Sequence, residues 1–490
     1  GGDDSITVDG TGNKTINGGT GTDTLIISRS INLEDFASAS YDGGTDSTGT
    51  HTLTDSSGNT ISYTGIETLT VNGVSYQTIY VRSYGARNDV LDGAYSVTAA
   101  YYSSASNKVV LFDRGGFTNL SVATLRSAYG GTATDALTIV GSANVDYIVG
   151  STGQGALTIN AGAGNDEIKV ANGGVADTVY AEAGDDIVFV DNEDLTADNV
   201  LDGGAGSDTL VFNFAGSAVT YTINANVPAN FENLVGTTGD DTLTGDSNAN
   251  KIYGGIGLDT LYGLGGDDVL YGDIPAYQAS SSYGWSDDGS YISGASSLPG
   301  YSGSQGGGLS KSVWYQHSWQ PSVSGNDKLY GGSGDDTLYG AAGDDTLDGG
   351  TGKDLMAGGP GADTFVIRSG DGNSDVANAN VVYDFQDGTD IVGLDGLSYG
   401  DLTISQGSGD NANHVVVSRT SSSEYLLILQ NVSVSSINYY DFVSTDTSSQ
   451  TLSGSSSGDV LLGGSGNDTF TTNNGTDVIL GYGGDDSITV

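Results

Sequence analysis

Between residues 331 and 365 the chain starts the same nine-residue unit again and again. Each unit contains glycines, an aspartate and, two positions after the aspartate, one large apolar residue: Leu338, Leu347, Met356 and Phe365. The 79 glycines of the 490-residue chain would suggest disorder, but disordered segments rarely carry apolar side chains at a fixed spacing. The unit therefore predicts short strands, each with one buried side chain, between glycine-rich turns.

The unit has the form GGxGxDxUx, where U is the apolar residue. We expect its first six residues to form a turn, in which glycine permits positive φ angles and leaves carbonyl groups accessible, and its last three to form a strand. A flexible turn lined by carbonyl oxygens and a carboxylate suits Ca²⁺ better than Mg²⁺, which demands a stricter octahedron. Because nine residues make half a coil, alternate U residues should face each other from the two sheets of a parallel solenoid. The sequence predicts an all-β fold in which calcium-binding parallel β-roll blocks alternate with small antiparallel β domains and caps.

The unit recurs in blocks along the chain. A second regular series places its apolar residues at Leu243, Ile252, Leu261 and Leu270. Looser turns occur within residues 161–170, 181–190 and 201–212, and further copies lie near both ends. Many turns in phase favour a calcium-binding β-roll over a plain array of glycine-rich turns. The candidate calcium ligands are the sixth-position aspartates: Asp4, Asp23, Asp166, Asp186, Asp208, Asp241, Asp259, Asp268, Asp327, Asp336, Asp345, Asp354, Asp363, Asp459, Asp468, Asp477 and Asp486.

The charge composition agrees with many bound cations. Sixty-one acidic and 14 basic residues give a net charge of −47, which opposes compaction unless cations neutralise it. About fifteen Ca²⁺ ions would contribute roughly +30, and without them we expect the repeat blocks to be unfolded. The acidity argues against nucleic acid and anionic membranes as partners, and the lack of cysteine excludes thiolate metal sites. Calcium is plentiful outside cells, so we expect a secreted, extracellular or cell-surface protein without membrane insertion.

These repeats resemble the RTX family of secreted bacterial proteins, and most closely its surface-layer and adhesin-type members. Residues 358–397 resemble the end of an RTX β-roll followed by an antiparallel cap, and residues 65–73 and 231–246 resemble the lead-in segments that precede such rolls. The resemblance implies type I secretion and calcium on the sixth-position aspartates. Three places depart from the pattern and make calcium doubtful there: residues 172–179, Asn250 and Asp146.

Catalysis is not expected. His51, His317 and His414 lie far apart and form no HExxH motif, which argues against a metalloprotease. The letters GLSYG around Ser398 match a nucleophile elbow but lack a strand–turn–helix context. The aspartate pairs recur in every turn, which marks them as ion ligands and solvated neighbours rather than an acid–base pair.

The expected segments are 1–30, repeat turns; 31–75, a β segment leading to a lead-in cap; 76–135, a relatively basic β-rich domain; 136–212, an irregular β-roll; 213–236, a lead-in cap; 237–272, a β-roll; 273–324, an insertion; 325–365, a β-roll; 366–450, an antiparallel cap; and 451–490, a β-roll. Residues 119–130 are expected to form one short helix, and residues 414–432 a hairpin. The basic domain either meets an acidic roll of a neighbouring subunit or presents an ordinary solvated face.

The insertion carries all three tryptophans in a Ser- and Gly-rich background. Exposed aromatic residues suit a protein contact or sugar stacking, and the alternative is a self-packed loop that covers the roll. The candidate interaction residues are Trp285, Trp314, Tyr315 and Trp319.

The chain starts and ends with GGDDSITV. The identity suggests one period of a longer tandem array, or subunits whose rolls stack end to end; coincidence between two near-consensus turns is the alternative. The functional prediction is an extracellular calcium-dependent structural protein that assembles with copies of itself into a surface layer, sheath or fibril. The alternative is an adhesin region that binds glycans or cells through the insertion, and a remote third possibility is the carrier portion of a hydrolase.

Overall fold

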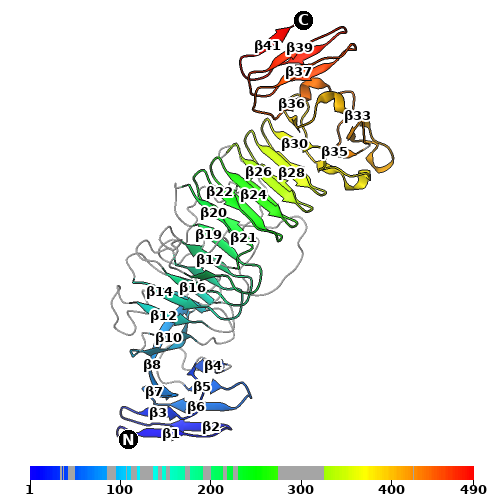
Figure 1. Ribbon diagram of the computed structural model, residues 1–490. Coiled ribbons are helices and arrows are strands. Elements are labelled where there is room, and N and C mark those ends of the chain that lie inside the picture. Colours follow the sequence, from blue (N-terminus) through cyan, green and yellow to red (C-terminus); the bar gives the residue numbers. More distant parts are fainter. Residues whose placement is uncertain are drawn as a thin grey trace. The chain divides into compact units, whose positions relative to one another are not determined.

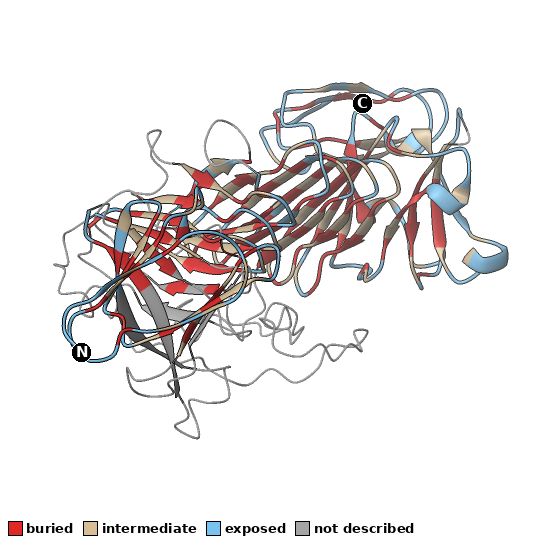
Figure 2. Cartoon of the chain, turned by 90° about the horizontal axis from the view of Figure 1, so that it is seen from below, coloured by how far each residue is buried: buried red, intermediate tan, exposed pale blue. Residues whose placement is uncertain are grey.

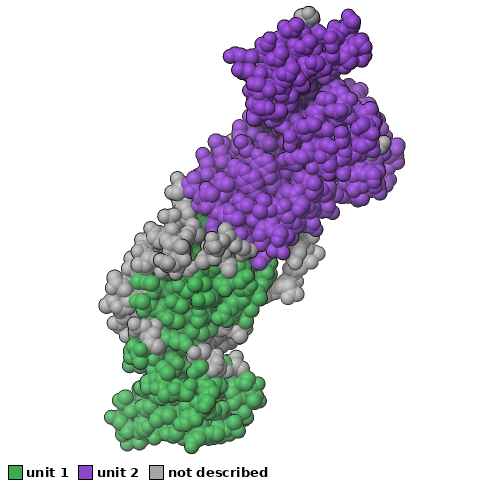
Figure 3. Space-filling model, viewed as in Figure 1, with its two compact units in different colours: residues 1–214, 224–231, 284–313 green, residues 215–223, 232–283, 314–490 purple. Residues whose placement is uncertain are grey.

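The computed structural model describes residues 1–33, 36, 38–41, 50–84, 95–105, 108–111, 118–121, 136–141, 146–149, 155–170, 177–190, 200–212, 218–223, 230–273, 325–422 and 424–489. These residues form β-strands and short 3₁₀ turns, with no α-helix among them, which confirms the all-β prediction. The chain divides into two compact units (Figure 3). Unit 1 contains residues 1–214, 224–231 and 284–313, and unit 2 contains residues 215–223, 232–283 and 314–490.

Unit 1 begins with parallel strands that join an antiparallel sheet (Figure 1). One sheet starts with three parallel strands, β1 (Ser5–Val8), β3 (Thr24–Ile27) and β7 (Thr68–Val71). A second sheet contains, in order, β2 (Lys14–Asn17), β6 (Thr60–Thr64), β5 (His51–Thr54) and β4 (Ser38–Tyr41), of which only β2 and β6 pair in parallel. Alternate residues of both sheets fill one core, where Leu25, Leu53 and Leu69 are fully buried.

The first sheet continues through a long antiparallel hairpin into a second roll. The hairpin consists of β8 (Val74–Tyr84) and β9 (Tyr95–Ser103), and β9 pairs antiparallel with β10 (Lys108–Leu111). One parallel ladder then runs through β10, β12 (Leu137–Val140), β14 (Leu157–Asn160), β16 (Thr178–Tyr180) and β18 (Leu201–Asp202). The other runs through β11 (Thr118–Ser121), β13 (Asp146–Val149), β15 (Glu167–Lys169), β17 (Ile187–Val190) and β19 (Thr209–Phe212).

The helix expected over residues 119–130 is wrong at its start. Its first three residues belong to β11, which pairs in parallel with β13 so that Leu120 is the register partner of Ile148. The pairing places this segment in the sheet, and tertiary pairing of this kind overrides a weak local helical pattern. The remainder of the expected helix lies outside the described residues.

Unit 2 contains the regular roll. One parallel ladder comprises β20 (Thr220–Thr222), β22 (Thr242–Thr244), β24 (Thr260–Gly265), β26 (Lys328–Ser333), β28 (Thr346–Thr351) and β30 (Thr364–Arg368). The other comprises β21 (Asn233–Val235), β23 (Lys251–Gly255), β25 (Val269–Asp273), β27 (Thr337–Tyr339) and β29 (Leu355–Ala357). The U residues stack in register in both ladders and are fully buried, forming the rows of buried positions in Figure 2. The predicted alternation of U residues between two sheets is therefore confirmed.

The cap after the roll is mixed rather than antiparallel throughout. The parallel ladders extend into β31 (Asn380–Val382), β32 (Ile391–Asp395) and β36 (Phe442–Ser444). Antiparallel pairing joins β33 (Leu402–Gln406), β34 (Val415–Arg419) and β35 (Tyr425–Leu429), with one further bridge between Asn373 and Tyr425, and β34 with β35 forms the predicted hairpin. The strands outside the hairpin stay parallel because they still bury apolar residues in register with the roll, as Phe365 and Val392 do.

A further parallel roll lies at residues 451–489. One sheet contains β37 (Thr451–Ser453), β39 (Thr469–Thr471) and β41 (Ser487–Thr489), and the other contains β38 (Val460–Leu462) and β40 (Val478–Leu480). Its core is small: Phe470 is fully buried and Leu462 nearly so, whereas Ile488 is 56% exposed.

Candidate calcium sites

The sixth-position aspartates form a ladder that connects successive coils. The amide of Asp241 donates to Oδ1 of Asp259 at 2.7 Å, the amide of Asp259 to Oδ1 of Asp327 at 2.7 Å, and the amide of Asp327 to Oδ1 of Asp345 at 2.8 Å. The same pattern runs along the other edge of the roll and through unit 1, where Asp166 and Asp186 are joined at 2.6 Å. One carboxylate oxygen of each aspartate therefore fixes the stacking of the coils.

The second carboxylate oxygen of most of these aspartates has no hydrogen-bond partner. It is buried, and a buried unpaired carboxylate oxygen costs several kcal/mol unless a cation or donor compensates it. This applies to Oδ2 of Asp23, Asp166, Asp186, Asp259, Asp268, Asp327, Asp336, Asp345, Asp354 and Asp363.

The first glycine of each turn gives this oxygen its surroundings. A Cβ atom on Gly254 would lie 2.4 Å from Oδ2 of Asp259 and 2.4 Å from the carbonyl oxygen of Gly272 in the next coil. Glycine thus leaves open a position that a carboxylate oxygen and a main-chain carbonyl oxygen approach together. The described residues include no group of three or more His, Cys, Asp or Glu side chains suited to a metal, and the oxygens that approach this position are one carboxylate oxygen and one main-chain oxygen. A set of hard oxygen donors of this kind fits Ca²⁺.

Burial and mutual repulsion both act on the stacked carboxylates. Burial, together with the charges of neighbouring aspartates, raises the pKa of Asp259 to about 7 and that of Asp327 to about 9. In unit 1, burial likewise raises the pKa of Asp166 to about 9. Near neutral pH, the stacked carboxylates of a metal-free turn are therefore either protonated or destabilised by their mutual repulsion. A bound divalent cation neutralises the carboxylates and so favours their deprotonated form.

Some predicted ligands have different surroundings. The Oδ2 atoms of Asp241, Asp459 and Asp468 accept main-chain amides of their own turns, from Thr237, Ser455 and Gly464 at 2.5, 2.6 and 3.0 Å. Asp4 and Asp486 are exposed, and Asp477 is half-buried. The assignment of an ion to each individual aspartate stays a prediction.

Several residues of the ladder were not among the predicted ligands. Asp146 and Asp177 are fully buried; the amide of Asp146 donates to Asp166, and Oδ1 of Asp177 accepts the amide of Leu157 at 2.6 Å. Their turns lack consensus glycines, but each aspartate stands two positions before a buried apolar residue, and that spacing was the available signal. Asn250 also occupies the ladder, donating its amide to Oδ1 of Asp268 at 2.8 Å without adding charge.

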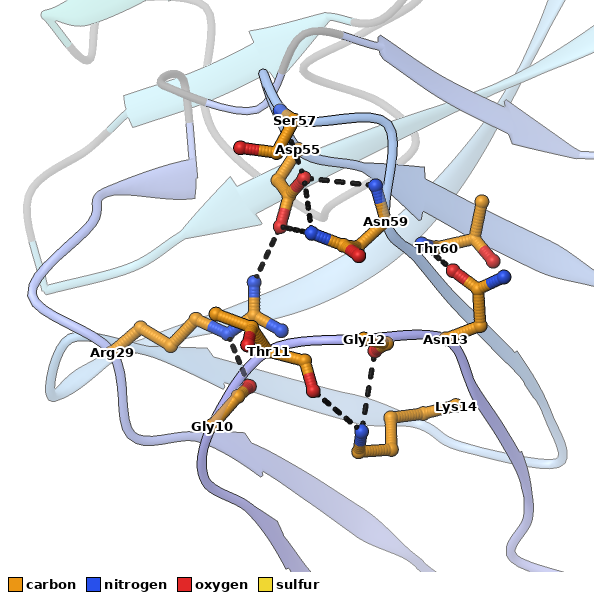
Figure 4. Close-up of polar contacts among 10 residues, drawn as sticks. All are labelled: Gly10, Thr11, Gly12, Asn13, Lys14, Arg29, Asp55, Ser57, Asn59 and Thr60. Atoms are coloured by element: carbon orange, nitrogen blue, oxygen red, sulfur yellow. Dashed lines mark hydrogen bonds and ion pairs between the residues drawn. The ribbon is translucent and has the colours of Figure 1, made fainter.

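One turn near the amino terminus uses cations of the protein itself (Figure 4). Lys14 occupies the sixth position of this turn, and its Nζ donates to the carbonyl oxygens of Thr11 and Gly12 at 3.0 and 3.2 Å. Arg29 Nε donates to the carbonyl oxygen of Gly10 at 2.8 Å. Three consecutive carbonyl groups thus bind side-chain cations, so this turn needs no metal ion.

The other candidate residues within the described part of the chain are Ser398, His414 and His51. Ser398 Oγ donates to Oδ2 of Asp401 at 2.7 Å and caps the 3₁₀ turn η5 (Tyr399–Asp401). Nδ1 of His414 accepts the amide of Asn431, and His51 is buried. These contacts are those of turn and core residues. The candidate interaction residues Trp285, Trp314, Tyr315 and Trp319, together with His317, lie outside the described residues.

Comparison with known proteins agrees with the geometry of the turns. The model of the RTX calcium-binding nonapeptide repeat (four copies) matches residues 158–188, 173–194, 195–213, 230–261, 245–274, 323–356, 330–365, 339–373 and 453–488. The chain therefore carries RTX calcium-binding nonapeptide repeats, which bind several calcium ions. Among solved structures, a subunit of the mannuronan C5-epimerase of Azotobacter vinelandii, determined in solution, is 26% identical; the match covers 25% of this chain and 76% of that one, with a TM-score of 0.20. No curated protein matches the chain.

Proposed function

We propose that the chain is an extracellular structural protein whose β-rolls, made rigid by calcium, assemble with copies of itself into a surface layer, sheath or fibril. The observation that supports the proposal is the stack of buried carboxylates with unpaired oxygens. Because these oxygens need a cation, folding of the roll depends on calcium, as a structural role requires. Calcium at extracellular concentration then acts as the folding signal after secretion. No helix among the described residues is long and apolar enough to cross a membrane.

Apolar groups on the roll surface support self-association. Leu258 and Leu264 are 56% and 52% exposed in successive turns, which lie at opposite edges of the regular roll because β23 and β25 belong to one sheet and β24 to the other. Leu264 has a φ of 78°, a conformation in which glycine is normally preferred. A chain that keeps a strained, exposed leucine at this position gains little from it as a monomer, whereas contact with a second copy would bury it.

Electron microscopy of the purified full chain tests the proposal. We expect ordered polymers in millimolar Ca²⁺ that dissolve on addition of a chelator, and fewer or shorter polymers from a Leu258→Ser, Leu264→Gly double variant. A matched double variant in the same roll, Thr242→Ser with Thr260→Ser, should polymerise like the parent. Monodisperse monomers at every calcium concentration would contradict self-assembly.

A second candidate function is adhesion through the aromatic insertion. The observation that favours it is that the roll keeps its register across the insertion, since Leu261 pairs with Leu329, so the inserted residues are an addition the roll does not require. Glycan-array or cell binding that is lost in Trp314→Ala and Trp319→Ala, without change in the calcium-dependent melting temperature, would favour adhesion over assembly.

A further inference from the structure

The insertion interrupts a single repeat turn. Gly272 and Asp273 occupy the first two positions of this turn, and Gly325, Asn326 and Asp327 occupy the fourth to sixth. A Cβ atom on Gly325 would lie 1.6 Å from the carbonyl oxygen of Gly257, so Gly325 keeps the place of a fourth-position glycine in the stack of coils. The two ends of the insertion are therefore parts of one formed turn.

This turn contains an additional buried carboxylate. The second position is glycine in the consensus, as at Gly255, which is the register partner of Asp273 in the preceding coil. Asp273 is 4% exposed and Asp327 is 1% exposed. Oδ1 of Asp273 and Oδ2 of Asp327 both lack a hydrogen-bond partner, although Oδ2 of Asp273 accepts the Gly325 amide at 3.4 Å. Two unpaired carboxylate oxygens are thus buried where other turns of the roll have one.

The two carboxylates lie in the same part of the turn. A Cβ atom on Gly272, the residue before Asp273, would lie 2.2 Å from Oδ2 of Asp327 and 2.5 Å from the carbonyl oxygen of Gly340. Gly325 lies between the two carboxylates: its amide donates to Oδ2 of Asp273 at 3.4 Å, and a Cβ atom on it would lie 2.8 Å from Oδ1 of Asp327. The two carboxylates, one from each side of the insertion, therefore lie close to each other within one turn.

We propose that Asp273 and Asp327 jointly bind one Ca²⁺ ion at the base of the insertion, with main-chain carbonyl oxygens completing the ligand set. Calcium affinity rises with the number of charged ligands, so this site should fill at lower calcium concentration than turns with a single carboxylate. A bound ion would join the two ends of the insertion, and the loop would be anchored before the rest of the roll is saturated. The proposal does not depend on self-assembly, because it concerns calcium binding within one chain.

Hydrogen exchange of the full chain, measured across a series of buffered free Ca²⁺ concentrations, tests the site. In the parent, peptides covering residues 269–273 and 325–330 should become protected at about tenfold lower Ca²⁺ than a peptide covering residues 349–354, because the extra carboxylate strengthens binding. Asp273→Asn should raise the midpoint at the base of the insertion about tenfold and leave the midpoint of residues 349–354 unchanged. Asp273→Gly, which restores the consensus residue, should give the same shift in midpoint. Agreement between the two variants would show that the shift comes from loss of the carboxylate and not from the asparagine side chain.

Asp246→Asn is the matched control. Asp246 occupies the same second position in a neighbouring turn, but its Oδ1 accepts the Asn248 amide at 2.7 Å and the sixth residue of its turn is Asn250. This variant should leave the midpoints at the base of the insertion and of residues 349–354 unchanged. The proposal is wrong if Asp273→Asn and Asp273→Gly leave the midpoint at the base unchanged or lower it, or if they shift all peptides equally.

Discussion

Each sixth-position aspartate has two roles, one for each carboxylate oxygen. In Asp345, Oδ1 accepts the amide of Asp327 from the preceding coil, and Oδ2 is buried without a partner. Asn250 keeps only part of this pattern: its main-chain amide donates to Oδ1 of Asp268, but its own Oδ1 accepts the main-chain amide of Asp246 in the same turn, and its side chain carries no charge. An aspartate such as Asp345 thus combines one oxygen that holds the preceding coil with a second, charged oxygen that is available to a cation.

Gly254, the first glycine of a turn in the regular roll, should not tolerate a side chain. Gly254→Ala would place a methyl group 2.4 Å from both Oδ2 of Asp259 and the Gly272 carbonyl oxygen, so we expect a lower calcium affinity in that turn. Overpacking of this kind should also destabilise the calcium-bound protein by about 1–3 kcal/mol, measured by urea unfolding. In the control Gly265→Ala, the new methyl group would meet Ser333 Oγ at 3.2 Å, and a side chain can move. Equal effects of the two variants would contradict the role given to Gly254.

Lys14 should stabilise its turn whether or not calcium is present. Lys14→Ala removes two charge-assisted hydrogen bonds to carbonyl oxygens of the turn, so amide exchange near residues 14–17 should accelerate by about tenfold. The change should be the same in calcium and in chelator, because no ion is involved. Lys353→Ala, at the fifth position of another turn, is the control and should have no effect near residues 14–17. An effect of Lys14→Ala seen only in calcium would show that the turn binds the metal after all.

At the scale of elements, the sequence predicted the regular roll well because one rule governs it. The residue two positions after the aspartate is buried in every regular turn, so the spacing of Leu338 and Leu347 was enough to assign the sheets. The rule failed where glycine was missing. The turns of Asp146 and Asp177 lack the consensus glycines, which made calcium binding there doubtful, although both aspartates keep the spacing to the buried apolar residue.

Contacts between distant segments could not be read from the sequence. The parallel strands of the cap carry no repeat signal, and only their register with the roll, such as Val381 beside Leu355, reveals them. Similarly, the contact of Arg29 with Gly10 depends on how one coil stacks on the next. The sequence places Asp273 at the start of the insertion. Only the structure shows that it occupies the second position of a repeat turn that continues at Gly325.

The stacked turns should make the metal-free roll more stable in acid. Burial raises the pKa of Asp259 and Asp345 to about 7, so below this pH the folded state binds protons that the unfolded chain releases above about 4. The stabilisation is complete below the unfolded pKa and is lost as the pH rises through the folded pKa. Calcium-depleted protein should therefore melt at a higher temperature near about pH 5 than near about pH 8. With saturating calcium the difference should shrink or reverse, since ions compete with protons. A metal-free melting temperature that rises with pH would contradict this account.

At the scale of the whole chain, dependence on calcium is unevenly distributed. The regular roll of unit 2 contains a series of unpaired buried carboxylate oxygens. In the antiparallel sheet of unit 1, by contrast, the carboxylate of Asp55 accepts hydrogen bonds from Arg29 Nη1 at 2.8 Å, from the Ser57 amide at 3.0 Å and from the Asn59 amide at 2.9 Å (Figure 4). These hydrogen bonds, that of the Asn59 amide above all, lower the pKa of Asp55, so this carboxylate is stable in its charged form without a metal.

Removal of calcium should therefore unfold the chain in parts. Far-UV dichroism should lose much of its β signal in chelator, and hydrogen exchange should show full exposure of amides in residues 242–273 and 328–357. Residues 51–64 should keep their protection from exchange, because Leu53, Ile61 and Tyr63 are buried in an apolar core. The carboxylate beside this core, Asp55, is neutralised by Arg29 and needs no metal ion. The double variant Arg29→Met, Asp55→Leu, which removes that pair together, is the control and should leave the order of unfolding unchanged. Two results would contradict the account: a chelated chain that keeps its whole β signal, or one in which residues 51–64 lose protection together with the roll.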